Sequence, residues 1–263
     1  MKISLLVILL SITHPLTYAD SDTGKIDTSL DGLFSLSLAD LSKLRITTVS
    51  KKSELTLEAP GVVNVVTASE IRAFGATDIK DVLLRVPNLY IFDSSTFSAS
   101  GVNMRAGSSQ HINNHVLYLI NGRPLRESQN GGLHTDINLL LPVNSLERIE
   151  IIRGPGSVLY GSSAFNSTIN FITKKAEKNT QATVNGMQGS DNYSRVGASW
   201  SSPIGDNGGV SLNVGGLDSD GKTITALDES GVRGSQNLSR DGKSFLLNSN
   251  YGGLTFNLSL IHI

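Results

Sequence analysis

Residues 149–175 read IEIIRGPGSVLYGSSAFNSTINFITKK. Two runs rich in β-branched residues flank a segment of Gly, Pro and Ser, which predicts a strand, a tight connection and a second strand. The glycines do not make a nucleotide loop. Gly156 and Gly161 have the Walker A spacing, but Ser162 stands where that loop needs lysine, and Leu159 replaces the third glycine of a dinucleotide loop. We therefore expect the glycines to turn the chain.

The residues before this segment predict a compact α/β unit. The run VVNVVT is a strand candidate, and Thr67 or Ser69 could cap a short helix after it. The stretch ATDIKDVLLRVPNL predicts the clearest helix, with Thr77 as its cap. Within VLYLINGRPL, the pair Asn121-Gly122 predicts a tight hairpin turn.

The pattern changes after residue 177. Segments of about ten residues, as in outer-membrane barrel strands, alternate in polarity between Gly, Asp and Asn turns. Their apolar positions include Val196, Ala198, Trp200, Val210, Leu212, Val214, Phe245, Leu247, Tyr251, Leu254, Phe256, Leu258 and Leu260. A soluble antiparallel sheet shows the same alternation, so the strands alone leave both structures open.

The N-terminus favours the barrel. A basic start at Lys2, an apolar run over residues 3–12 and the small-residue site TYA before Asp20 predict a secretory signal peptide. A net charge of −1 gives no electrostatic case for nucleic acid, and the absence of cysteine excludes disulfides and thiolate metal sites. His111 and His115 precede a predicted strand and would not share a face, so we expect no metal there. No catalytic set has a distinctive context, so we expect neither an enzyme nor a cofactor.

The run ERIEIIRGPGSVLYGSSAFNSTINFITKK resembles the end of the plug domain of TonB-dependent outer-membrane receptors. The family pattern is approximately E-R-I-E-V-x-R-G-P-x-S-x-L-Y-G-x-x-A-x-G-G-x-I-N-I-x-T-K. The matches are Glu147, Arg148, Glu150, Arg153, Gly154, Pro155, Leu159, Tyr160, Gly161, Ala164, Ile169, Asn170 and Thr173. IKDVLLRVPNLYI, VNMRAG and VLYLINGRPL resemble the plug helix, its I-x-I-R-G strand and its V-L-V-D-G-V-P-L hairpin, in that order. Asn166-Ser167 replaces the Gly-Gly of the pattern.

The resemblance implies a fold and a domain order. We expect an α+β plug domain followed by antiparallel transmembrane β-barrel strands that form an incomplete barrel, because such barrels have 22 strands. The expected order is a signal peptide (1–19), a flexible N-terminal segment (20–52), the plug (53–177) and about five barrel strands (178–263). The chain would then be a C-terminally truncated receptor.

The resemblance also implies a function and site residues. Such receptors take up ferric siderophores or cobalamin across the outer membrane of Gram-negative bacteria, with energy from TonB. TonB would bind Ile46, Thr47, Thr48 and Val49 by strand addition. Arg105 and Arg153 would pair with acidic residues of the barrel wall. Ser95, Phe97, Arg126 and His134 lie in the expected outward loops and are candidates for the nutrient.

The expected partners are TonB, the nutrient and outer-membrane lipid, without nucleic acid, cofactor or metal. The alternative is a periplasmic plug-like module that binds ligand or TonB without transport.

Overall fold

The structure is a computed structural model, and all residues that it describes belong to one compact unit, Leu38–Ile263. The described ranges are 45–46, 54–55, 62–93, 100–104, 115–125, 140–154, 156–161, 163–176, 179–227 and 230–262. The expected signal peptide and most of the flexible N-terminal segment therefore lie outside the described residues. No helix in the described ranges is long and apolar enough to cross a membrane.

A five-stranded mixed sheet forms the first half of this unit. Its strands stand in the order β3-β8-β9-β6-β7, and only β6 and β9 are parallel neighbours. Their bounds are β3 (Val62–Thr67), β6 (Val116–Ile120), β7 (Arg123–Leu125), β8 (Leu146–Arg153) and β9 (Ser167–Thr173). Every residue of β9 is buried, because β9 lies between β8 and β6 and both of its faces are covered. The opening segment thus supplies the central strand of this sheet.

Two short helices begin with capping boxes. In α3 (Ala68–Ala73) the predicted cap Thr67 is confirmed, since its side chain accepts from the Glu70 amide. In α4 (Ile79–Leu83) the prediction of Thr77 is wrong. Asp78 is the N-cap, and its carboxylate accepts from the Asp81 amide at 2.9 Å.

Apolar side chains of the mixed sheet pack against these helices. The core contains Ile149, Ile151, Ile169 and Phe171 from the sheet together with Ile71, Ile79, Val82 and Leu83 from α3 and α4. Leu246, about 100 residues further along the chain, belongs to the same cluster. The core thus extends beyond the mixed sheet, and burial of these side chains is its main source of stability.

The glycines of the opening segment turn the chain, as predicted. Gly154 and Gly161 have φ of 126° and 79°, and the short helix α6 (Ser157–Tyr160) stands between them. Asn166 and Ser167 are not among the described residues with positive φ; the left-handed residue of this connection is Ser163, with φ of 52°. The chain therefore needs no Gly-Gly before β9, because its left-handed turn lies three residues before Asn166.

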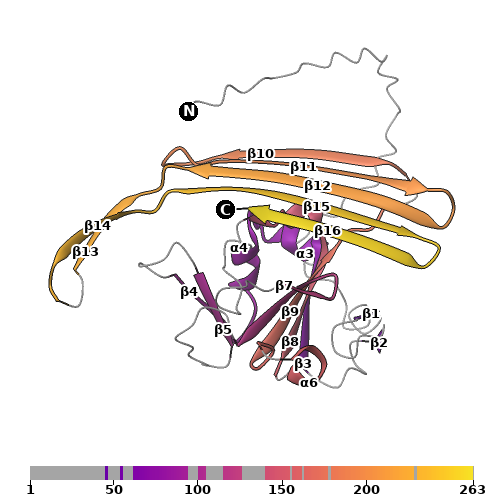
Figure 1. Ribbon diagram of the computed structural model, residues 1–263, viewed down its shortest axis with the longest axis horizontal. Coiled ribbons are helices and arrows are strands. Elements are labelled where there is room, and N and C mark those ends of the chain that lie inside the picture. The colour runs from indigo at the N-terminus through magenta and orange to yellow at the C-terminus, as the bar shows by residue number, and fades with distance from the viewer. Residues whose placement is uncertain are drawn as a thin grey trace, which may run out of the picture. The chain divides into compact units, whose positions relative to one another are not determined.

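A second sheet contains five long antiparallel strands in sequence order (Figure 1). They are β10 (Gln181–Gln188), β11 (Ser194–Ile204), β12 (Gly208–Ser219), β15 (Arg240–Tyr251) and β16 (Leu254–His262). Short turns connect β11 to β12 and β15 to β16. Between β12 and β15 the chain forms a separate hairpin, β13 (Thr223–Leu227) and β14 (Arg233–Asn237). We call the five strands the long sheet.

The long sheet has one polar face and one apolar face. The register aligns Ser201, Ser211, Asn248 and Asn257 across four strands, and the alternate positions Trp200, Leu212, Leu247 and Leu258 form the neighbouring row. The polar face carries Leu246 and contacts the mixed sheet, so we call it the inner face. On the outer face large apolar side chains are exposed, for example Leu254 at 79% and Val184 at 83%. The predicted alternation is confirmed.

The remaining described elements are short. They are β1 (Arg45–Ile46), β2 (Glu54–Leu55), β4 (Leu89–Asp93), β5 (Ser100–Met104) and the 3₁₀ turn η1 (Val143–Ser145). β1 pairs with β2, and β4 pairs with β5, both antiparallel.

Candidate functional site: the junction between the two sheets

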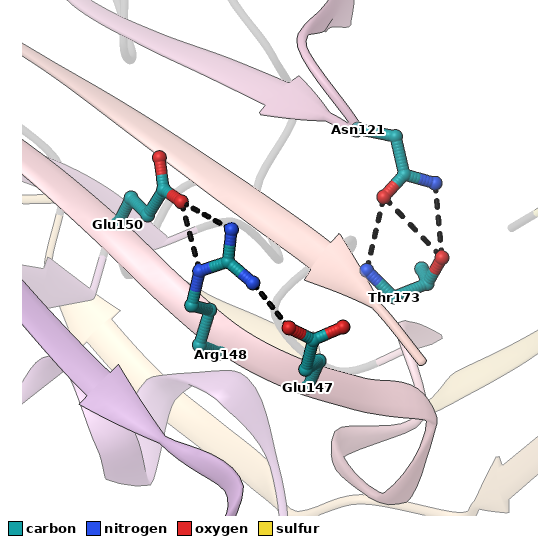
Figure 2. Close-up of polar contacts among 5 residues, drawn as sticks. All are labelled: Asn121, Glu147, Arg148, Glu150 and Thr173. Atoms are coloured by element: carbon teal, nitrogen blue, oxygen red, sulfur yellow. Dashed lines mark hydrogen bonds and ion pairs between the residues drawn. The ribbon is translucent and has the colours of Figure 1, made fainter. Parts of the chain in front are cut away.

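The hairpin turn between β6 and β7 reaches the inner face of the long sheet. Asn121 and Gly122 have φ of 50° and 78°, which confirms the predicted Asn-Gly turn. The Asn121 side chain accepts from the Thr173 amide at 3.0 Å (Figure 2). The side-chain nitrogen of Asn121, Nδ2, lies 3.1 Å from Asn248 Oδ1 and 3.5 Å from Asn257 Oδ1. One side chain thus joins a turn of the mixed sheet to β15 and β16.

Arg148 lies between two carboxylates at the start of β8 (Figure 2). Its Nε and Nη2 lie 2.9 and 2.8 Å from Glu150 Oε1, and its Nη1 also contacts Glu147. Neighbouring strand residues normally point to opposite faces, but the register shifts between Leu146 and Arg148. This irregularity allows Glu147 and Arg148 to meet.

Glu150 is fully buried on the sheet face opposite α3 and α4. It pairs across the ladder with Asn170 of β9, whose side chain accepts from the Gly122 amide at 3.0 Å. Burial raises the pKa of Tyr160 in α6, and the negative charge of Glu150 raises it further. Because Arg148 supplies the countercharge, the carboxylate can remain inside the sheet.

Arg195 of β11 makes a second contact between the sheets. Its Nη1 donates to the Thr77 carbonyl at 2.7 Å, immediately before α4. Burial raises the pKa of Asp78, while the Asp81 amide and the positive charge of Arg195 act in the opposite direction. The buried guanidinium thus lies where the first turn of α4 carries its acidic residues.

Glycines of the long sheet allow the two sheets to approach closely. A Cβ on Gly215 would lie 2.7 Å from Ser244 Oγ and 3.5 Å from Pro142 Cγ. A Cβ on Gly209 would lie 2.5 Å from the Cβ of Ala176, in the segment that leads from β9 into the long sheet. Larger residues at these positions would push neighbouring chain away from the inner face.

Two cavities lie along this junction. One of about 410 Å³ is lined by polar side chains that include Asn121, Arg148, Lys174, Asn248 and Asn257. The other, of about 200 Å³, lies beside Thr77, Pro142, Arg195 and Gly215. Among the residues that the structure describes, no three metal-ligating side chains gather. The junction is therefore a polar interface with small cavities.

Most residues predicted for function fall outside the described ranges. These are Thr47, Thr48, Val49, Ser95, Phe97, Arg105, Arg126 and His134. Ile46 lies in β1 and pairs with Glu54 of β2. Arg153 lies at the end of β8 and is half-buried, and its Nε has no hydrogen-bond partner among the described residues.

Comparison with known proteins matches the part of the chain that contains the mixed sheet to a family. Residues 56–168 match the model of the TonB-dependent receptor plug domain. The chain carries a TonB-dependent receptor plug domain. We call the mixed sheet with its helices the plug, and the long sheet the wall. The predicted plug followed by antiparallel barrel-type strands is confirmed.

Several known proteins are similar to this chain in sequence or in fold. The vitamin B12 transporter BtuB of Photobacterium profundum is 32% identical over 158 residues, 59% of this chain and 25% of BtuB. The pyoverdine outer-membrane receptor FpvA of Pseudomonas aeruginosa PAO1 is 18% identical, with a TM-score of 0.59 over 82% of this chain and 29% of FpvA. The siderophore receptor PirA of Acinetobacter baumannii is 23% identical, with a TM-score of 0.55 over 76% and 31%. The chain thus spans about a quarter to a third of the length of these relatives.

Sequence reasoning did not find three residues of the junction. Arg148 and Glu150 are two apart in a predicted strand, a spacing that places both on one face and could have indicated the ion pair. Arg195 is a lone cation on the polar face of a predicted barrel strand, which is also a recognisable signal. For Asn121 only the turn was readable, since the bonds of its side chain depend on strands more than 120 residues away.

Proposed function

We propose that the chain acts as the plug and first wall strands of a receptor for TonB-dependent nutrient uptake across the outer membrane of a Gram-negative bacterium. The observation that carries this proposal is the wall. It follows a plug domain directly, turns its polar face to the plug, and exposes Trp200, Leu254 and Phe256 on the other face. An apolar outer face opposite a polar interior is the pattern of transmembrane barrel strands. Export would use the signal peptide over residues 1–19.

The substrate class that we propose is a scarce nutrient such as a ferric siderophore or cobalamin. A vitamin B12 transporter is the relative with the higher identity, and the structural neighbours are siderophore receptors. Ser95, Phe97, Arg126 and His134 remain our candidates for contact with the nutrient. The chain would bind and pass its substrate unchanged, without catalysis and without a resident cofactor.

Arg153 supports the proposed ion pairing between plug and barrel. Its side chain is half-buried, and its buried Nε has no hydrogen-bond partner among the described residues, an arrangement that is costly for a cation unless an acid accompanies it. We therefore propose that Arg153, and Arg105 with it, meet acidic residues of the barrel wall.

TonB is the proposed energy-coupling partner, and residues 46–49 are its proposed binding segment. When a peptide binds by adding a strand to the edge of a sheet, backbone hydrogen bonds provide most of the affinity. The two-residue pairing of β1 with β2 supports this proposal, because Arg45 and Ile46 have extended backbone there. TonB would then add its sheet edge to this segment.

A proline placed in this segment tests the proposal. Thr47→Pro removes a backbone N–H, whereas Thr47→Ala changes only the side chain. We expect Thr47→Pro to abolish binding of the chain to the purified periplasmic domain of TonB, and Thr47→Ala to leave it nearly unchanged. Isothermal titration calorimetry measures both. Equal binding by the proline variant and the parent chain would contradict the assignment of this segment.

If the chain were instead a periplasmic binding module without transport, the outer face of the wall would be in contact with water. The exposed apolar residues of that face favour the membrane instead, since soluble proteins rarely expose large apolar patches.

A further inference from the structure

Asn121 combines two roles that are usually separate. Its backbone is the first of two residues with positive φ in a hairpin turn, and its side chain contacts both the plug and the wall. We propose that Asn121, Asn248 and Asn257 form an amide latch that fixes the central hairpin of the plug against the wall. This inference deepens the proposed function, and it rests on that function only in treating β15 and β16 as wall strands.

The contacts of Asn121 fix the orientation of its amide. The Thr173 backbone N–H can only donate, so the side-chain atom 3.0 Å away must be the oxygen of Asn121. The amide nitrogen then points to the wall. This nitrogen, Nδ2, donates to Thr173 Oγ1 at 2.9 Å, to Asn248 Oδ1 at 3.1 Å and to the more distant Asn257 Oδ1 at 3.5 Å. The wall must present acceptors here, and two asparagines supply them.

The two asparagines on the wall side of the latch lie next to each other. Asn248 and Asn257 are direct cross-strand partners on β15 and β16, so their side chains stand next to each other on the inner face. Both line the 410 Å³ cavity together with Asn121. The two acceptors thus belong to one rigid pair of strands.

The plug side of the latch cannot easily rotate away. The backbone amide of Asn121 donates to the Phe171 carbonyl at 2.9 Å. The backbone amide of Gly122 donates to Asn170 Oδ1 at 3.0 Å. Both partners lie in β9, the central buried strand. Displacement of the latch would therefore require the whole hairpin β6–β7 to move relative to the wall.

The latch is neutral, in contrast to the contact between Arg195 and Thr77. Hydrogen bonds between uncharged amides have no charge for salt to screen and no group that titrates between pH 5 and 8. We therefore expect the latch to hold across salt and pH conditions that would alter an ionic contact. Such a contact positions the plug independently of its charged anchors.

Spin labels on plug and wall test the latch directly. The chain has no cysteine, so cysteines introduced at the exposed positions Arg123 (plug) and Leu254 (wall) are the only labelling sites. Double electron–electron resonance on the purified chain reports the distribution of distances between them. A second pair within the plug, at Arg123 and the exposed Leu84, reports whether the plug remains folded.

Three variants separate the latch from general damage. Asn248→Leu with Asn257→Leu removes both acceptors while leaving the plug sequence intact. Asn248→Asp with Asn257→Leu restores one acceptor oxygen. Asn250→Leu is the matched control, because Asn250 lines the same cavity without a hydrogen bond to Asn121.

We expect the double-leucine variant to shift the plug-to-wall distances to longer values and to broaden them. The aspartate variant and the Asn250→Leu control should keep the narrow distribution of the parent chain, and the pair within the plug should stay narrow throughout. An unchanged plug-to-wall distribution in the double-leucine variant would overturn the latch, as would an equal broadening in the control. If the double-leucine variant fails to fold, Asn121→Gly takes its place, because it removes the latch from the plug side and keeps the turn. Longer and broader plug-to-wall distances in that variant would support the latch, and an unchanged distribution would overturn it. The assay uses neither TonB nor nutrient, so failure of the proposed function would appear separately, in the binding measurement with TonB.

Discussion

Arg148 keeps a carboxylate inside the plug. Glu150 has no exposed side-chain area, and two guanidinium nitrogens of Arg148 lie within 2.9 Å of its Oε1. Removing one partner of a buried pair leaves the other charge uncompensated, which typically costs about 3–5 kcal/mol. We expect Arg148→Met to lower the free energy of unfolding by about this amount, as measured by urea denaturation of the chain in detergent.

Two companion variants show whether burial is the cause. The Glu147 side chain is 45% exposed, so Glu147→Gln should change the free energy of unfolding by less than about 1 kcal/mol. Arg148→Met combined with Glu150→Leu should recover most of the loss, because no charge then remains buried. If Arg148→Met alone is as stable as the parent chain, the ion pair does not hold Glu150 in place.

Residue roles could be predicted only where neighbours in sequence determine them. Thr67 and the turn at Asn121-Gly122 follow from local rules of capping and turn chemistry, and both are confirmed. The left-handed conformation of Ser163 could not be read from the family pattern, whose Gly-Gly stands at Asn166-Ser167. Contacts between plug and wall depend on tertiary packing, so no local pattern indicated the bonds from Asn121 to Asn248. The pairing of Arg153 stays a prediction.

At the scale of elements, α4 depends on its first turn. The helix has five residues, too few to be stable by propensity alone, so its cap and its packing must hold it. Asp78 caps the helix, and Thr77 donates its hydroxyl to Asp81 at 2.7 Å. The sequence-based prediction placed the N-cap one residue early, because Thr77 and Asp78 are both good N-cap residues. Only the backbone conformation distinguishes which of the two is the N-cap.

Substitution of Asp78 separates its cap from its charge. Asp78→Ala removes the cap and should lower the free energy of unfolding by about 1 kcal/mol. Asp78→Asn keeps the cap and removes a carboxylate whose pKa burial raises above 3.8. A raised carboxylate pKa means that ionisation opposes folding, so at pH 7 Asp78→Asn should melt at or above the temperature of the parent chain.

The pH dependence checks the sign of this effect. As the pH falls through the raised pKa of folded Asp78, protonation removes the opposing charge and the two melting temperatures should converge toward pH 3.8. Asp81 acts in the other direction. Burial alone would raise its pKa, but hydrogen bonds from Thr77 and Asp78 outweigh burial and lower the pKa, so its contribution is lost only below pH 3.8. Thermal melts of both chains between pH 3.8 and 7 measure the difference; a gap that widens on acidification would contradict this account.

Elements with a regular hydrophobic pattern or clear cap and turn residues were predictable, and elements without either signal were not. The strands of the wall have 8 to 12 residues with regular alternation, which is enough to set both their existence and their faces. α6 has four residues within a glycine-rich connection, and no periodicity can appear over that length. The hairpin β13–β14 is polar on most of its positions, so it carries little hydrophobic pattern either.

At the scale of the whole molecule, the wall has one face that packs on the plug and an opposite face that is apolar and exposed. The plug core includes Leu246 from the inner face, while the outer face exposes apolar side chains on all five strands. The alternation alone left a soluble sheet possible. The register favours a barrel-type wall, because it gathers the apolar positions of neighbouring strands into continuous rows that water would not cover favourably.

Trp200 makes the lipid contact measurable. It is the only tryptophan of the chain and lies on the outer face in the row of Leu212 and Leu247. With the chain reconstituted in vesicles, we expect lipids brominated in their acyl chains to quench its fluorescence strongly and aqueous iodide to quench it weakly. The matched variant, Trp200→Phe with Ser199→Trp, moves the tryptophan to the inner face and should reverse this preference, since successive strand residues point to opposite faces. Stronger iodide quenching at position 200 than at position 199 would mean that the outer face meets water, and the wall would then be a soluble sheet.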